Sequence, residues 1–114
     1  MSDARVILEA VLHGLGGRAA ELDALLAELA TASRTEPGCH AFRIATGDEP
    51  GDVAVVSFYA DEAALRAHYA TPHYRRYRAQ VGQLLARPSD VIVYHVNGAV
   101  RAQDPNLPDP DKLG

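Results

Sequence analysis

Hydrophobic and polar residues follow one another along the first half of the chain in patterns typical of short regular elements. Val6 to His13 is a β-branched and aliphatic run that predicts a strand, and Arg18 to Thr35 carries leucines at helical spacing between acidic residues, which predicts a helix. Cys39 to Thr46 and Val53 to Tyr59 predict two further strands. The turn residues Asp48 to Asp52 lie between them, so we expect these two strands to form a hairpin.

The second half of the chain predicts two short helices that meet at a bend, followed by a strand. Asp61 is suited to cap the first helix, because its side chain can accept a bond from a free backbone amide. Thr71-Pro72 interrupts that helix and starts the next, since proline suits the first position of a helix and Thr71 can accept a bond from the freed amides. The helices are expected to end near Arg87-Pro88, and Asp90 to Asn97 predicts the last strand.

The predicted order of strand, helix, strand, strand, helix, strand is the ferredoxin-like βαββαβ arrangement. This α+β fold has a four-stranded antiparallel sheet with both helices on one face. The face of the first strand that should pack on the helices is wholly apolar and consists of Val6, Leu8, Ala10 and Leu12. We expect the opposite face of the sheet to present Ile7, Val11, Val53, Val55, Ser57 and Tyr59. Such an apolar face invites a second sheet, which predicts a homodimer in the form of a dimeric α+β barrel.

Length, charge and cysteine content limit the domain organisation and the classes of partner. With 114 residues, 47% of them hydrophobic, the chain fits one compact domain, which we assign to residues 1–97, and a proline-rich acidic tail at 98–114. The net charge of -4 argues against nucleic acid as a partner. No apolar run reaches the roughly 20 residues that span a bilayer and the first residues lack a signal-peptide core, so we expect a cytoplasmic protein without a membrane partner. The single cysteine, Cys39, excludes an internal disulfide.

Aromatic and titratable residues gather between Tyr59 and Tyr77, which holds four of the five tyrosines and two of the five histidines. His68 lies in the last turn of the first predicted helix and His73 in the first turn of the second. Both rings can therefore point toward the same corner of the fold. The two histidines straddle the proline bend and no acidic residue recurs at a spacing typical of metal ligands, so we predict no metal site.

Two stretches of the sequence resemble the antibiotic biosynthesis monooxygenase family. They are Glu36-Pro37-Gly38-Cys39-His40-Ala41-Phe42 and the longer stretch from Ala60 to Tyr74, which contains His68 and Thr71-Pro72-His73. The family consists of small dimeric α+β barrels that include quinol monooxygenases and polyketide anthrone oxygenases. The resemblance covers roughly Val6 to Val96 and is closest to the quinol monooxygenase type.

Three departures narrow what this resemblance implies. Where many members carry Glu-x-Trp at the end of the third strand, this chain has Ser57-Phe58-Tyr59. The anthrone oxygenase type is expected to have asparagine at position 55 and tyrosine at position 65, where this chain has Val55 and Leu65. Haem-degrading relatives use a histidine near position 73 together with a first-strand asparagine and a tryptophan near position 68, and only His73 of that set is present.

The resemblance implies a cofactor-independent monooxygenase that acts on a small aromatic substrate and dioxygen. In such an enzyme a base removes a proton from a phenol or hydroquinone in a dry pocket, and the resulting anion passes an electron to dioxygen. Histidine suits the base, because its ordinary pKa is about 6.5. His68 is the predicted base, with Tyr59 as its positioning partner and His73 as the second catalytic candidate. The predicted contacts to the substrate are Tyr59, Phe42, Tyr77, Val55, Glu9 and His13.

Other functions stay open on the same fold. One is a haem-binding or haem-degrading monooxygenase that uses His73. Another is a non-oxidative isomerase or cyclase, which would keep the base but consume no oxygen. A ligand-binding dimeric barrel would keep the pocket and need no base. Oxygen consumption separates the oxidative functions from the others.

Overall fold

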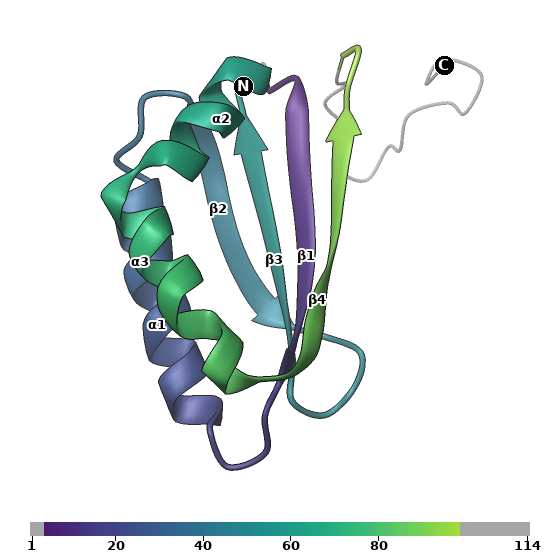
Figure 1. Ribbon diagram of the computed structural model, residues 1–114. Helices are drawn as coiled ribbons and strands as arrows, with labels where there is room; N and C mark the ends of the chain where they lie inside the picture. The colour runs from purple at the N-terminus through teal and green to yellow at the C-terminus, as the bar shows by residue number, and fades with distance from the viewer. Residues whose placement is uncertain (1–3, 99–114) are drawn as a thin grey trace, which may run out of the picture.

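The computed structural model describes residues 4–98, so the predicted proline-rich tail lies outside it apart from its first residue. The predicted order of elements is confirmed (Figure 1). A short 3₁₀ turn, η1, precedes the last strand. The elements are β1 (Val6–Gly14), α1 (Ala19–Ser33), β2 (Cys39–Thr46), β3 (Asp52–Tyr59), α2 (Glu62–Ala70), α3 (Pro72–Val81), η1 (Gly82–Leu84) and β4 (Leu85–His95).

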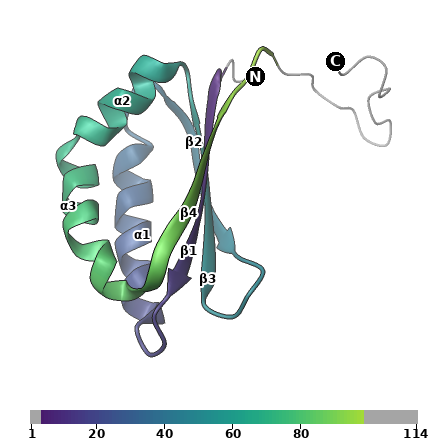
Figure 2. The same cartoon turned by 45° about the vertical axis from the view of Figure 1, so that its right-hand side comes forward.

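The four strands form one antiparallel sheet in the order β2-β3-β1-β4, which is the ferredoxin-like topology. The predicted hairpin of β2 and β3 is confirmed. Figure 2 shows that all three helices lie on one side of the sheet and that no other described element covers the opposite side. None of the helices within residues 4–98 is long and apolar enough to span a membrane.

One threonine ends α2 and begins α3. The Thr71 hydroxyl donates to the carbonyl of His68 at 2.7 Å and accepts from the amide of Tyr74 at 3.2 Å. Pro72 follows as the first residue of α3, where its missing amide hydrogen costs nothing. Asp61 caps the start of α2 by accepting from the amide of Ala64 at 2.8 Å. The predicted bend and both predicted caps are therefore confirmed.

The last strand begins earlier than the sequence predicted. Helix α3 ends at Val81 rather than near Arg87-Pro88, and β4 begins at Leu85 rather than at Asp90. Pro88 lies inside β4, which is possible because β4 is an edge strand and a proline there need not donate to a neighbouring strand. The pairing with β1 shifts its register between Val11 and His13, close to this proline.

The hydrophobic core lies between α1 and the sheet. The leucines that recur at helical spacing in α1 are all buried, as the pattern predicted: they are Leu22, Leu25, Leu26 and Leu29. From β1, Val6, Ala10 and Leu12 are buried against the helices, and Leu8 packs at the edge of the same core. The predicted helix-facing side of β1 is therefore confirmed.

The predicted orientation of β3 is wrong. Val55, Ser57 and Tyr59 face the helices and are buried, with Ser57 and Tyr59 fully inaccessible. The physical reason is the register, which sets Leu8 opposite Ser57. Residues directly opposite one another in antiparallel strands project to the same face of the sheet. The helix-facing side of β1 therefore fixes the helix-facing side of β3.

The open face of the sheet carries a different apolar set from the predicted one. By register and alternation its apolar members are Ile7, Val11, Ala54, Val56, Phe58, Ile92 and Tyr94. Ile92 and Tyr94 are 50% and 44% exposed. The open face thus carries apolar residues, as predicted, although Val53, Val55 and Tyr59 do not belong to it.

Gly38 permits the turn before β2 to approach α2 closely. Its carbonyl accepts from the amide of Ala60 at 2.9 Å, and a Cβ added at Gly38 would lie 2.4 Å from the Cβ of Ala64. We therefore expect Gly38→Ala to lower the free energy of unfolding by about 1–3 kcal/mol through overpacking. Urea unfolding measures it.

The matched control removes the Cβ of Ala64, which is the atom that a Cβ at position 38 would meet. Ala64→Gly alone should cost no more than about 1 kcal/mol of helix propensity. Combined with Gly38→Ala, it should recover part of the loss, so that the double variant is more stable than the sum of the single effects predicts. Strict additivity of the two substitutions would contradict a direct contact between these positions.

Candidate active site

A cavity of about 430 Å³ lies between the helices and the sheet, within the size range of small-molecule sites. Its buried polar lining residues are Ser57, Tyr59 and His68. The rest of the lining is mostly aliphatic and aromatic, with the exposed residues Arg78, Pro88 and Val91 on its solvent side. The other lining residues are Leu8, Ala10, Leu12, Leu26, Leu29, Phe42, Val55, Tyr69, Tyr74, Tyr77, Val81 and Ser89.

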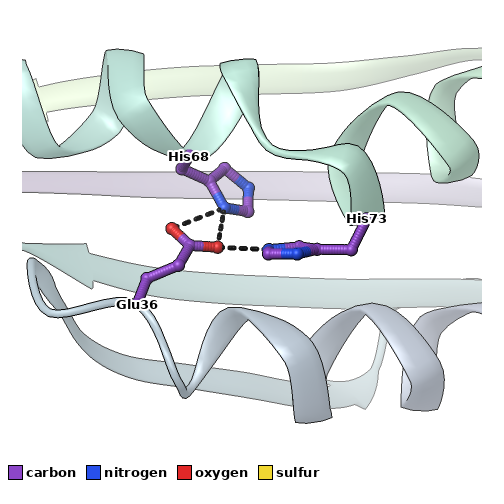
Figure 3. A group of neighbouring side chains, drawn as sticks. All are labelled: Glu36, His68 and His73. Atoms are coloured by element: carbon purple, nitrogen blue, oxygen red, sulfur yellow. Dashed lines mark hydrogen bonds and ion pairs between the residues drawn. The ribbon is translucent and has the colours of Figure 1, made fainter.

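A carboxylate joins the two histidines of the predicted corner. Figure 3 shows Glu36 between His68 and His73, with its carboxylate directed at both rings. The Glu36 oxygens lie 2.9 and 3.2 Å from Nδ1 of His68, and Oε2 lies 2.5 Å from Nε2 of His73. The three side chains are largely removed from solvent, at 12% exposure for Glu36, 4% for His68 and 15% for His73.

Three separate segments position this cluster. Glu36 lies in the turn between α1 and β2, where its amide donates to the carbonyl of Ser33 and its carbonyl accepts from the amide of Cys39, both at 3.1 Å. His68 lies in the last turn of α2 and His73 in the first turn of α3. The meeting of the two histidines was predicted from the Thr71-Pro72 bend. The part played by Glu36 was missed, because it lies 32 residues before His68.

The cluster orients the His68 ring chemically. A carboxylate that accepts from Nδ1 keeps the proton of the neutral ring on that nitrogen and leaves Nε2 with its lone pair. The same carboxylate stabilises the imidazolium that forms when Nε2 takes up a proton. Of the three residues only His68 lines the cavity. His73 stands on the far side of Glu36 and helps to hold the carboxylate in place.

Aromatic rings surround His68. The ring centroid of Tyr74 lies 5.0 Å from that of His68, and the centroid of Tyr59 lies 5.3 Å from it. Phe42 and Tyr69 follow at 6.2 and 5.8 Å. These separations are typical of tilted aromatic pairs. A flat aromatic molecule in the cavity would meet rings of its own kind beside the imidazole.

Tyr59, which is buried, and Tyr77, which is partly buried, stay protonated over the physiological range. Burial raises the pKa of Tyr77 to about 12, and burial likewise raises the pKa of Tyr59 well above its ordinary value. Both hydroxyls are therefore available as hydrogen-bond donors. The hydroxyls of Tyr59 and Ser57 are buried and interact with each other, but neither forms a hydrogen bond of full geometry with a described residue.

The structure brings together most, but not all, of the residues that the sequence singled out. Tyr59, Phe42, Tyr77 and Val55 line the cavity with His68, and their contacts to a substrate stay predictions. Glu9 and His13 do not join them, because β1 directs their side chains to the open face of the sheet. Glu9 there accepts from the hydroxyl of Tyr94 at 3.3 Å.

His13 is held between two carboxylates at one end of the open face. Its Nδ1 lies 2.8 Å from Asp52 of β3, and its Nε2 lies 2.8 Å from Asp90 of β4. The ring is 6% exposed and so links three neighbouring strands through charged hydrogen bonds. This arrangement explains why His13 is buried without reaching the cavity.

The Glu36, His68 and His73 cluster is also the group most suited to a metal ion among residues 4–98. One ligand atom from each residue lies within 4.8 Å of the others. Two imidazoles and a carboxylate form a donor set typical of divalent iron or zinc. The sequence argued against a metal because no acidic residue recurs at a spacing typical of metal ligands, and folding brings Glu36 to the two histidines instead. In this structure the carboxylate oxygens are engaged in hydrogen bonds with the two rings.

The model of the antibiotic biosynthesis monooxygenase family matches residues 5–80, a range that includes Glu36, His68 and His73. The chain belongs to this family. The match confirms the resemblance stated from the two sequence stretches, and it covers most of the cavity lining as well as the cluster.

Individual relatives agree with this assignment. The Mycobacterium tuberculosis protein named "Putative monooxygenase Rv0793" is 40% identical over 72 residues, which cover 63% of this chain and 71% of the relative. The solved structure of Rv0793 superposes with a TM-score of 0.81 at 32% identity, covering 86% of this chain and 100% of that one. A Caulobacter crescentus structure that bears the family name has a TM-score of 0.77 at 25% identity and covers 87% of this chain and 92% of that one.

The hydrogen bonds of His13 to Asp52 and Asp90 predict a pH dependence of the free energy of unfolding. Hydrogen bonds to Asp90 and Asp52 raise the pKa of His13, so the folded chain binds this proton more tightly than the unfolded chain does. The resulting stabilisation is complete below the unfolded value of about 6.5 and is lost as pH rises through the raised folded value. Urea unfolding over this window should show the free energy of unfolding falling with pH.

His13→Gln should remove this part of the pH dependence. His95→Gln, which replaces an exposed histidine of β4, is the matched control and should keep it. A pH slope that is the same in His13→Gln and in the parent would mean that the two carboxylates do not hold an imidazolium.

Proposed function

We propose that this protein is a cofactor-independent monooxygenase that oxidises a quinol or a related phenolic molecule with dioxygen. The observation that carries the proposal is the buried hydrogen bond between Glu36 and Nδ1 of His68, at the edge of an aromatic cavity. Family membership supports an oxidative reaction, since relatives bear the name of monooxygenases. The substrate class and the independence from a cofactor are part of the proposal.

The proposed chemistry begins with a proton transfer. Nε2 of His68 takes the proton of a phenolic hydroxyl, and Glu36 stabilises the imidazolium that results. The phenolate transfers one electron to dioxygen, and the phenoxyl radical and superoxide combine at a ring carbon that carries a hydrogen. The resulting peroxide anion takes the proton back from His68. Loss of that ring hydrogen and cleavage of the O–O bond then release water and leave the other oxygen atom as a quinone carbonyl. The apolar lining favours this sequence by keeping water away from the radical pair.

The alternatives differ from this proposal in what they require of the same residues. Ligation of haem by Nε2 of His73 would require the hydrogen bond between this nitrogen and Glu36 to break. In addition, His73 does not line the cavity. An isomerase or cyclase would use His68 in the same way without consuming oxygen. A ligand-binding protein would need the cavity but not the Glu36–His68 pair, which is the feature that favours an enzyme.

We also propose that the protein is a homodimer that pairs through the open face of the sheet. Ile92 and Tyr94 leave a large part of their side chains exposed there, beside partly exposed aliphatic residues of β1 and β3. Exposed apolar residues that gather on one face of a sheet are typical of a protein–protein interface. The proposed dimer therefore rests on residues such as Phe58, Ile92 and Tyr94, and not on Val53, Val55 and Tyr59, which the sequence had assigned to this face.

Oxygen uptake tests the proposed reaction. Purified protein, treated with a chelator and free of flavin and haem, should consume oxygen with at least one member of a panel of hydroquinones and anthrones. His68→Ala should lower the rate by about 10² to 10⁴, the range of general-base contributions, and raising the pH should restore part of it as the substrate ionises unaided. Glu36→Gln should cause a smaller loss, because the ring remains but its orientation and charge partner change.

His95→Ala is the control for this series, because it removes an exposed histidine outside the cavity. Equal activity of His68→Ala and the parent from about pH 6 to about pH 9 would show that His68 is structural. Activity that disappears with the chelator and returns with divalent metal would instead assign Glu36, His68 and His73 to a metal ion.

The dimer is tested by sedimentation. Ile92→Lys should shift the protein toward monomer without unfolding it, because the side chain is already half exposed and a charge on each partner would be buried and repelled at the interface. Leu15→Lys changes a residue of 40% exposure in the loop after β1 and should leave the dimer intact. A parent protein that sediments as a monomer at micromolar concentration would contradict the proposal.

A further inference from the structure

We propose that the hydroxyls of Ser57 and Tyr59 form an oxygen-recognition site inside the cavity, where they bind the ring oxygen of a hydroxylated or keto aromatic ligand. This inference rests on the proposed function for the identity of the ligand as a substrate. It goes further in naming Ser57 as a binding residue and in stating which part of the ligand is recognised.

The two hydroxyls are unusual for buried groups. Ser57 and Tyr59 are both fully inaccessible to solvent. Their hydroxyls interact with each other, and neither forms a hydrogen bond of full geometry with any of residues 4–98. An unpaired buried hydroxyl destabilises a fold, because its bonds to water are lost and not replaced. Two such groups, two residues apart on one face of β3, indicate that a bound molecule supplies the missing partner.

The surroundings indicate what kind of molecule that is. Both residues line the cavity, whose other walls are mostly aliphatic and aromatic apart from His68, Arg78 and Ser89, so an apolar ring fits beside this polar point. The centroid of the Tyr59 ring lies 5.3 Å from that of the His68 ring, so the side chain that carries one of the two hydroxyls packs beside the imidazole. Tyr59 is a donor because burial keeps it protonated, and Ser57 can donate or accept. The pair can therefore hold a phenol, a phenolate or a ketone oxygen.

The pair also decides which oxygen reacts. A ligand with several oxygens would place one of them against Ser57 and Tyr59, and that oxygen would be the one facing the predicted base. An aromatic ring of the same shape without an oxygen would leave both hydroxyls unpaired and would therefore bind more weakly.

Binding of two shape-matched probes tests the inference without turnover. In 1-naphthol and 1-methylnaphthalene a hydroxyl and a methyl group occupy the same position, and anaerobic titration calorimetry measures their affinities. The parent should prefer 1-naphthol. Ser57→Ala and Tyr59→Phe should each weaken 1-naphthol binding about fivefold to tenfold, as expected for the loss of one hydrogen bond, and leave 1-methylnaphthalene unchanged.

Ser33→Ala is a matched control. Ser33 is also fully buried with an unpaired hydroxyl, but it does not line the cavity, so the variant should bind both probes as the parent does. Urea unfolding should show that Ser57→Ala is at least as stable as the parent, because an unpaired buried hydroxyl has been removed. A loss of binding therefore cannot be ascribed to loss of the fold.

The outcomes separate this inference from the proposed function. Equal affinity of the parent for both probes, no binding of 1-naphthol at millimolar concentration, or an unchanged preference in both Ser57→Ala and Tyr59→Phe would overturn it, since the hydroxyls would then hold only water. A protein that shows the preference but consumes no oxygen with any hydroquinone would retain the recognition site and lose the monooxygenase function.

Discussion

The Glu36 carboxylate is the constraint on which the candidate site depends. A carboxylate largely removed from water must be paired, and here the turn before β2 brings it to two imidazoles from two different helices. The same bonds hold α2 and α3 at their bend, which the hydroxyl of Thr71 fixes from the backbone side. The Thr71 cap and the long-range bonds to Glu36 thus stabilise the same bend between α2 and α3. Together they fix the orientation of His68.

The sequence predicted the starts of α2 and α3 and the histidine corner well because short-range chemistry determines them. Asp61 caps the start of α2, and Thr71-Pro72 marks the start of α3. His68 and His73 are only five residues apart, on either side of the bend between these helices. Glu36 could not be assigned in the same way. It lies 32 residues before His68. Its local signals were an acidic residue ahead of a Pro-Gly turn, which also marks an ordinary helix end, and its place in a stretch that resembles the family; neither signal links it to the histidines.

The orientation of β3 was beyond the sequence for a different reason. Both of its faces are apolar in the pattern, since Val53 and Val55 alternate with Ala54, Val56 and Phe58. Periodicity alone cannot then decide which set faces the helices. A shift of one residue in the pairing register of the strand would exchange its two faces. Pairing with β1 decides it, because β1 has one wholly apolar face and one that carries Glu9 and His13. The same pairing explains why these two residues lie away from the cavity.

The corrected orientation separates two roles that the sequence had assigned to one surface. Tyr59 and Val55 line the cavity on the helix side, whereas Phe58, Ile92 and Tyr94 form the face proposed for association. Two protomers that pair through the open face therefore leave each cavity lined by its own chain. The solvent side of the cavity lies at Arg78, Pro88 and Val91, on α3 and the edge strand β4. Substrate entry would then be governed by residues outside the proposed dimer interface, so that association and access can vary independently.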